Sequence, residues 1–324
     1  MNRRTLLTAA TALLATPRFA LAQGNWPDRP VRVIVPFTPG GTTDILGRAI
    51  AAELQEVFNQ PFVVENRGGA GGTVGSEVVA RAAPDGYTIM MGHIGTLAVN
   101  PSLYRGLSFD PATAFAPIGM MAIVPNVLVV NPRKVPVNNV QELIALAKRQ
   151  PNVLTYGSGG NGSAAHTAMV AFNQATGTQM EHVPYRGTGP MMNDLIAGTI
   201  DMTLTGGPAA LPAARNNLVK ALGVSSLRRL SSAPDIPTIA EQGVAGFDAT
   251  QWYGLVAPAG TPRPIIDRIN EAQTRILNGP RLRPRLEAEG ADAAPSTPEE
   301  YRDFIARERT RWGELIRTTN MRAD

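Results

Sequence analysis

The residues best suited to chemistry lie in two glycine-rich segments of similar design. The first, PFTPGGTTD, spans residues 36–44 after the apolar run 31–35, and the second, GSGGNGS, spans residues 157–163 after another predicted strand. A helical pattern follows each segment. Glycine permits backbone conformations that expose N–H groups, and a helix N-terminus carries unpaired N–H groups and about half a positive charge. Each segment therefore predicts an anion site, and two facing segments could hold a dianion.

Polar side chains complete both segments. Thr42 or Thr43 and, in the second segment, Ser163 are expected as helix N-caps, since their hydroxyls can accept from a free N–H group. Asp44 is expected to stabilise the first helical turn, because a carboxylate repels an anion. Contact with a ligand is the alternative if that ligand carries an ammonium or a hydroxyl. A further alternative is that both segments are only tight turns, but their recurrence favours a binding site.

Other chemistries fit the sequence poorly. The glycine spacing in GSGGNG satisfies a dinucleotide fingerprint, but Glu181, about 20 residues further on, begins its predicted strand, whereas a ribose-binding acid belongs at a strand end. Ser163 and His166 lie three residues apart on one helix and supply no oriented catalytic triad. The chain has no cysteine, and its three histidines show no zinc-ligand spacing. No metal or other cofactor is therefore expected.

The N-terminus is typical of a secretory signal. Arg3 and Arg4 precede the apolar run 6–15, and residues 20–22 read ALA, a small-x-small cleavage site. Residues 1–22 are predicted to be a signal peptide that is cleaved near Ala22 and Gln23, by either the Sec or the twin-arginine route. Loss of the signal leaves 27 basic and 26 acidic residues, a net charge of +1. Nucleic acid is therefore not an expected partner.

Beyond residue 30, short β-branched runs alternate with amphipathic stretches, which is typical of an α/β fold. An apolar stripe from Ile45 to Val57 predicts the first helix, and a second stripe predicts the last helix after Pro298. The predicted strands span residues 31–35, 62–65, 88–92, 126–130, 153–156, 180–185, 202–205, 219–224 and 254–257.

Two segments are expected to connect two domains. They are the irregular stretch APIGMMAIVPNV at residues 116–127 and the proline-rich stretch 231–248. If the chain crosses at both, residues 125–247 form one lobe, and residues 23–124 and 248–324 together form the other. Two such crossings would act as a hinge.

The chain closely resembles the substrate-binding proteins of tripartite tricarboxylate transporters, the Bug family of periplasmic receptors. The resemblance spans nearly the whole mature chain and rests on WPDRPVRVIVPFTPGGTTDILGR, VVENRGGAGGTVGSEVVARAAPDGYTIMMG, VNPSLY, TYGSGGNGSAAHTA, VPYRGTGPMMNDLIAGTIDM and WYGLVAPAGTP, in family order. It implies an α/β, two-lobed type II periplasmic-binding-protein fold with a ligand cleft between the lobes. It also implies a periplasmic monomer without cofactors that delivers a carboxylated solute to membrane permease components.

The resemblance also implies which residues bind the solute. First-lobe contacts would come from Phe37, Thr38, Gly40, Gly41, Thr42 and Asp44, and second-lobe contacts from Ser158, Gly159, Asn161, Gly162, Ser163 and His166. Thr96 and Thr205 are similar to further cleft-facing positions.

Three other residues keep two interpretations each. Arg186 is either a partner for a second carboxylate or a solvated loop arginine. Trp252 and Tyr253 either border the cleft or pack at the hinge.

The solute itself is left open by the sequence. A dicarboxylate, a tricarboxylate, an amino acid or an aromatic acid would all present a carboxylate to backbone donors. The resemblance implies a receptor and not an enzyme. The alternative is an exported enzyme or a sensory binding module that acts on a small carboxylated metabolite.

Overall fold

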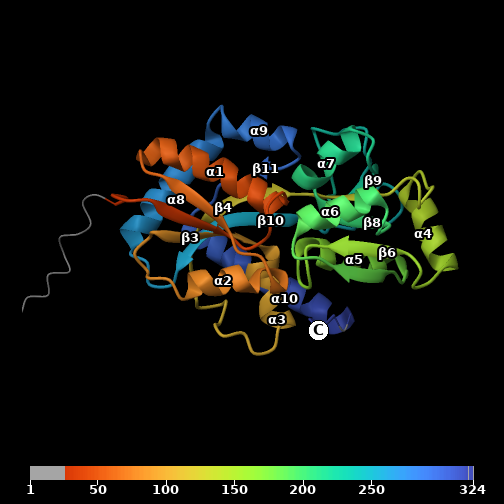
Figure 1. Cartoon of the computed structure of the whole chain (residues 1–324), viewed down its shortest axis with the longest axis horizontal. Coiled ribbons are helices and arrows are strands. Elements are labelled where there is room, and N and C mark those ends of the chain that lie inside the picture. Colours follow the sequence, from red (N-terminus) through yellow and green to blue (C-terminus); the bar gives the residue numbers. More distant parts are fainter. Residues whose placement is uncertain (1–25, 320, 324) are drawn as a thin grey trace, which may run out of the picture.

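The protein, seen in a computed structural model that describes residues 26–319 and 321–323, has a mixed α/β architecture with two separate β-sheets (Figure 1). The predicted signal peptide, residues 1–22, lies outside the described residues. The sheets lie side by side along the long axis, each with its own helices, so the molecule has two lobes (Figure 1). Within the described residues, no helix has the length and apolar character that a membrane span requires.

Lobe 1 is built on a six-stranded sheet with the order β11-β4-β10-β3-β1-β2. Its strands are β1 (Val31–Val35), β2 (Phe62–Asn66), β3 (Thr88–His93), β4 (Phe115–Val124), β10 (Gln251–Pro258) and β11 (Asp292–Ala293). β1 runs parallel to β2 and β3, whereas β10 runs antiparallel to β3 and β4. These central strands are apolar almost throughout, because helices cover both faces of the sheet.

Two apolar cores cover the two faces of this sheet. One face packs against α1 (Thr42–Phe58), α8 (Arg263–Asn278) and α9 (Leu282–Ala288). The other face packs against α2 (Thr73–Ala80), the turns η1 (Ala70–Gly72) and η2 (Gly95–Val99), α3 (Asn100–Leu103) and α10 (Pro298–Thr319). The apolar stripe on α1 predicted from the sequence faces the first of these cores, where Leu46, Ile50 and Leu54 are buried.

Lobe 2 is built on a five-stranded sheet with the order β7-β6-β8-β5-β9. Its strands are β5 (Asn126–Val130), β6 (Thr155–Ser158), β7 (Glu181–Pro184), β8 (Met202–Gly206) and β9 (Lys220–Val224). One face packs against α4 (Val140–Arg149) and α5 (Ala164–Thr176), and the other against α6 (Thr188–Ala197) and α7 (Gly207–Arg215). β6 runs parallel to both β7 and β8, so the loops after these strands meet at one end of the sheet.

The chain crosses between the lobes twice. Pro125 alone separates β4 from β5, and segment 225–250 separates β9 from β10. This segment packs in the core of lobe 2 through residues such as Phe247 and Ala249. We therefore propose that lobe 2 comprises residues 125–247, as expected from the sequence, with the return to lobe 1 a few residues later.

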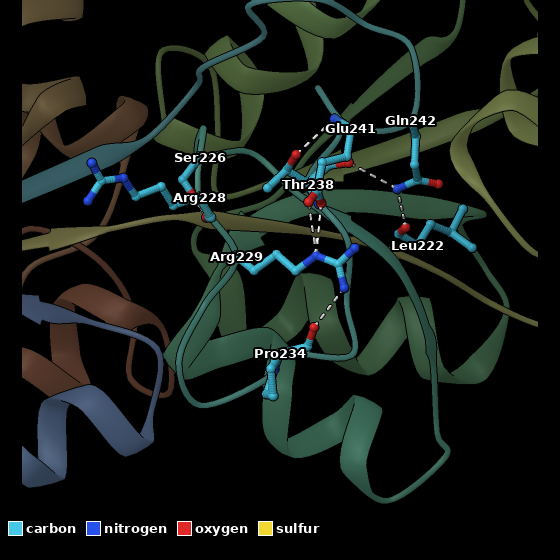
Figure 2. A network of polar contacts seen from close by, with 8 residues as sticks. All are labelled: Leu222, Ser226, Arg228, Arg229, Pro234, Thr238, Glu241 and Gln242. Atoms are coloured by element: carbon cyan, nitrogen blue, oxygen red, sulfur yellow. Dashed lines mark hydrogen bonds and ion pairs between the residues drawn. The ribbon is translucent and has the colours of Figure 1, made fainter.

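An ion pair joins two parts of the long segment 225–250. Arg229 Nε donates to both carboxylate oxygens of Glu241 at 3.1 and 2.9 Å, and Nη1 donates to the Pro234 carbonyl at 3.0 Å (Figure 2). Glu241 accepts from Thr238 N at 2.6 Å, and the Thr238 hydroxyl accepts from Glu241 N at 2.9 Å. Gln242 Nε2 also donates to the carbonyl oxygen of Leu222 in β9 at 2.8 Å, which attaches the segment to the sheet of lobe 2 (Figure 2).

Every strand predicted from the sequence has a counterpart near its expected position, and β1 and β5 match residue for residue. The prediction of an irregular stretch at 116–127 is wrong, because the ten-residue strand β4 occupies most of it. The prediction was wrong because Pro117 and Gly119 are residue types that regular strands rarely contain. Both pair with β10 close to register shifts, and such irregularities accommodate a residue that a regular ladder excludes.

Candidate ligand-binding site

A small buried cavity lies between the two lobes. It is lined from lobe 1 by Phe37, Thr42, Thr43, His93, Gln251 and Tyr253, and from lobe 2 by Gly159, Ser163, Ala164, Ala165, Thr188 and Thr205. Its volume of about 20 Å³ slightly exceeds what one water molecule needs. A larger hollow of about 630 Å³ lies beside α7 but is lined by lobe 2 alone. We take the interlobe cavity as the candidate site because it joins both glycine-rich segments.

Helices α1, α5 and α6 all begin at this cavity, and their first residues line it. The N-caps of α1 and α6 are Gly41 and Gly187, and neither helix has a side-chain cap. The N-cap of α5 is Ser163, as predicted, and its hydroxyl accepts from His166 N at 3.4 Å. Three helix ends with about half a positive charge each can together attract one or two negative charges.

The prediction that Thr42 or Thr43 caps α1 is wrong. α1 starts at Thr42 itself, and Gly41 in extended conformation precedes it. The Thr42 hydroxyl is buried without a hydrogen-bond partner. It lines the cavity together with Thr43 and Tyr253, and the three hydroxyls lie close enough to interact.

The cavity wall carries no formal charge. Among the described residues, no Asp, Glu, Lys or Arg lines it, and Arg186 is exposed to solvent instead. Burial lowers the pKa of His93 to about 4, so its ring is neutral near pH 7. His93 Nδ1 accepts from Thr96 N at 3.1 Å, so the ring proton is on Nε2. An anion here would be held by neutral donors and helix ends, not by an ion pair.

Asp44 accepts hydrogen bonds that fix the first glycine-rich segment, and it lies outside the cavity lining. Its Oδ2 accepts from Gly40 N at 3.0 Å, and its Oδ1 accepts from Arg48 Nε at 3.0 Å and Asn66 Nδ2 at 2.9 Å. Burial acts to raise the pKa of the Asp44 carboxyl, but these three bonds outweigh burial and lower the pKa overall. Asp44 does not line the cavity, so its contacts fit the structural role better than ligand contact.

Two stacked histidines hold the second glycine-rich segment. The rings of His166 and His182 lie 3.8 Å apart at 7°. Ser158 Oγ lies 2.6 Å from His182 Nε2 and accepts from Gly160 N at 3.1 Å, while Gly162 N donates to His166 Nδ1 at 3.1 Å. Burial, and to a lesser degree His182, lowers the pKa of His166 to about 3. The neutral His166 ring can therefore accept from the loop.

Glycines let the lobes meet around the cavity. A Cβ atom added at Gly187 would lie 2.0 Å from Thr38 Oγ1, and one added at Gly71 would lie 2.0 Å from the Asn161 carbonyl oxygen. The Tyr104 hydroxyl also donates to this oxygen across the lobes at 2.9 Å. The two lobes are thus in direct contact around the cavity.

The residues predicted to bind a ligand divide into three groups. Five of them line the cavity: Phe37, Thr42, Gly159, Ser163 and Thr205. Nine others lie behind the cavity wall or at the contact between lobes: Thr38, Gly40, Gly41, Asp44, Thr96, Ser158, Asn161, Gly162 and His166. Arg186 is exposed, which matches its alternative interpretation as a solvated loop residue.

Five further residues that line the cavity were not predicted from the sequence: His93, Ala164, Ala165, Thr188 and Gln251. Thr43, which also lines it, was expected only as a polar residue of the first glycine-rich segment. The sequence left two interpretations for Tyr253, a position at the cleft or packing at the hinge. In the structure Tyr253 lines the cavity and also lies close to the second crossing. The signal for Thr188 was present, because YRGTGP repeats the pattern of strand, glycine and helix that marks the other two segments. Within the described part of the chain, no group of three or more His, Asp or Glu side chains could hold a metal ion.

Comparison with known proteins agrees with this architecture. A family model described as "Tripartite tricarboxylate transporter family receptor" matches residues 46–321. Protein BugT of Bordetella pertussis is 35% identical over 322 residues, which cover 98% of this chain and 98% of BugT.

Two solved structures share both the sequence pattern and the fold. Rpa4515 of R. palustris, solved with adipate, is 36% identical with a TM-score of 0.89, over 92% of this chain and 99% of that one. MatC (Rpa3494) from Rhodopseudomonas palustris, solved with bound malate, is 33% identical with a TM-score of 0.85, over 90% of this chain and 100% of that one.

Proposed function

This chain belongs to the tripartite tricarboxylate transporter receptor family, and on that premise we propose that it is a periplasmic receptor for a small carboxylate. Residues 1–22 direct its export and are then removed. The mature monomer binds the solute between its lobes and delivers it to the membrane permease of a tripartite transporter. The protein makes and breaks no bond in the solute.

One observation supports this proposal most strongly. The N-termini of α1, α5 and α6 converge on a cavity that is lined by neutral side chains. Such a site attracts carboxylates through backbone N–H groups and helix dipoles. Its three helix ends suit a dicarboxylate better than a monocarboxylate, and the related Rpa4515 and MatC were solved with dicarboxylates, adipate and malate.

Binding is coupled to a change of shape. The cavity of about 20 Å³ is too small for a dicarboxylate, so the lobes must separate about the two crossings before a solute enters. The solute then contacts the helix ends of one lobe, and the other lobe closes onto it. The permease recognises this liganded form, because the solute favours the lobe arrangement that accommodates it.

Isothermal titration of the mature chain, beginning at Gln23, tests the proposal. The probes are adipate, malate, succinate, citrate, glutamate and benzoate, each at neutral pH. At least one dicarboxylate is expected to bind and to raise the melting temperature, since a ligand specific for the folded state stabilises it. Absence of heat and of a thermal shift with all six probes would overturn the proposal. Appearance of a chemically changed product would instead support an exported enzyme.

A further inference from the structure

A chain of buried hydrogen bonds runs from the cavity to the hinge. Tyr253 lines the cavity, and its hydroxyl bonds to Gln251 Oε1. Gln251 Nε2 bonds to Asn126 Oδ1, and Asn126 Nδ2 bonds to the Ala249 carbonyl at 2.6 Å. Asn126 begins β5 just after the first crossing, and Gln251 begins β10 just after the second. All four residues are buried, so water does not compete for these bonds.

The Ala249 carbonyl at one end of this series of hydrogen bonds fixes the direction of every bond in it. The Ala249 oxygen can only accept, so Asn126 turns its amide nitrogen to Ala249 and its amide oxygen to Gln251. Gln251 must then present its nitrogen to Asn126 and its oxygen to Tyr253. Tyr253 therefore donates its only hydroxyl proton to Gln251. The phenol oxygen has only lone pairs left, so it can accept but not donate toward the cavity.

We propose that Tyr253 makes the site selective for a hydroxy-dicarboxylate, whose hydroxyl donates to the phenol oxygen. The inference rests on the proposed function and refines its solute class. The three helix N-termini supply donors for the carboxylates, whereas Tyr253 supplies a fixed acceptor. An ammonium group would also donate, but no acidic side chain among the described residues lines the cavity, and three positive helix ends repel a cation.

Rotation of the lobes about the two crossings would leave this polarity in place. The hydrogen-bond chain lies at the two crossings, and atoms near a pivot move least when lobes rotate. Burial also raises the pKa of the Tyr253 hydroxyl, so it keeps its proton at neutral pH. Thr42 and Thr43 lie at the same wall. Hydrogen bonds from the Thr43 and Thr42 hydroxyls act to lower the pKa of the Tyr253 phenol, as donors to its oxygen do, and each threonine oxygen keeps lone pairs that can accept. The wall therefore presents acceptors at all three hydroxyls.

Titration with malate and succinate tests the inference, because the two dicarboxylates differ by a single hydroxyl. Malate is expected to bind the unmodified protein about tenfold more tightly than succinate, since succinate offers no hydroxyl to the acceptors of this wall. Equal affinities within about twofold would overturn the inference. So would binding of adipate without binding of malate. Silence toward every carboxylate would overturn the proposed function itself, which separates the two failures.

Two variants assign the preference to Tyr253. Tyr253→Phe removes the acceptor, and Gln251→Met frees the phenol proton to turn toward the cavity. Each is expected to bring the malate-to-succinate affinity ratio close to one, an effect that a purely structural role would not produce. Tyr87→Phe is the matched control, because its hydroxyl contacts Asp28 at the far end of lobe 1, and it should retain the ratio. If Tyr253→Phe does not fold, the malate-to-succinate affinity ratio of Gln251→Met tests the inference. An unchanged ratio in the folded variants would overturn the inference.

Discussion

At the scale of single residues, the site depends on histidines that stay neutral. His93 accepts from Thr96 N beside the cavity, and His166 accepts from Gly162 N in the second glycine-rich segment. Each bond needs a free lone pair on Nδ1, so protonation of that nitrogen would break it. Burial therefore serves the site in both cases, because it disfavours the charged ring.

These two histidines predict a loss of stability in weak acid. The unfolded chain binds a proton on each ring near pH 6.5, whereas the folded chain does so only near pH 4 for His93 and pH 3 for His166. Below pH 6.5 the unfolded state thus binds more protons, so stability falls as the pH decreases. At pH 5 we expect a loss of about 2 kcal/mol for each histidine relative to pH 7.5. Urea unfolding at the two pH values measures it, and equal free energies of unfolding would contradict the prediction.

At the scale of elements, three helices contribute the same part, an N-terminus that faces the cavity. The backbone at each N-cap is not helical, with φ of −90° at Gly41, −65° at Ser163 and 164° at Gly187. The first N–H group of each helix has no partner within the helix. Proline lacks this N–H group but is well tolerated as the first helical residue. It can therefore remove one donor and leave the helix intact.

The substitution Ala164→Pro would remove the first N–H donor of α5 and leave the helix intact. Ala164 is the first residue of the helix and lines the cavity, and the conformation of Ser163 suits a following proline. We expect the far-ultraviolet circular dichroism to stay the same. The affinity for the best dicarboxylate should fall at least tenfold, since a hydrogen bond to a charged group contributes about 1.5–3 kcal/mol. Ala164→Ser keeps the N–H group and is the control. Equal affinities of the two variants would exclude this N–H group from the site.

The sequence predicts helices and strands better than it predicts which side chains meet. The glycine-rich segments before α1 and α5 could be recognised because several glycines follow an apolar strand. The single Gly187 before α6 gives a weaker signal. Gln251 and Tyr253 could not be assigned to the cavity, because their direction depends on register shifts between β10 and β4. Arg186 illustrates the converse case, since its charge suggested a ligand contact that its exposed position does not support.

At the scale of the whole molecule, the proposed function predicts that affinity depends on how readily the lobes close. The measured dissociation constant increases as the fraction of closure-competent molecules decreases. We expect close contacts between glycines and the opposite lobe to affect this fraction. Gly71 faces the Asn161 carbonyl, Gly187 faces Thr38, and Gly95 faces the Gly162 carbonyl, each without room for a Cβ atom. A side chain at such a position acts on closure more than on the fold of either lobe.

The substitution Gly187→Ala tests whether a side chain at such a glycine impairs lobe closure without unfolding either lobe. Gly187 has φ of 164°, an extended conformation that alanine also adopts, so the backbone of lobe 2 should tolerate the methyl group. The methyl carbon would lie 2.0 Å from Thr38 Oγ1 in lobe 1 and hold the lobes apart. We expect a melting temperature close to that of the unmodified protein, an affinity for the best dicarboxylate at least tenfold weaker, and a larger radius of gyration in small-angle scattering with ligand. Gly313→Ala in α10, where the nearest atom is Ser102 Oγ at 3.1 Å, is the control and should change none of these. Unchanged affinity in folded Gly187→Ala would show that solute binds without approach of the lobes at this contact.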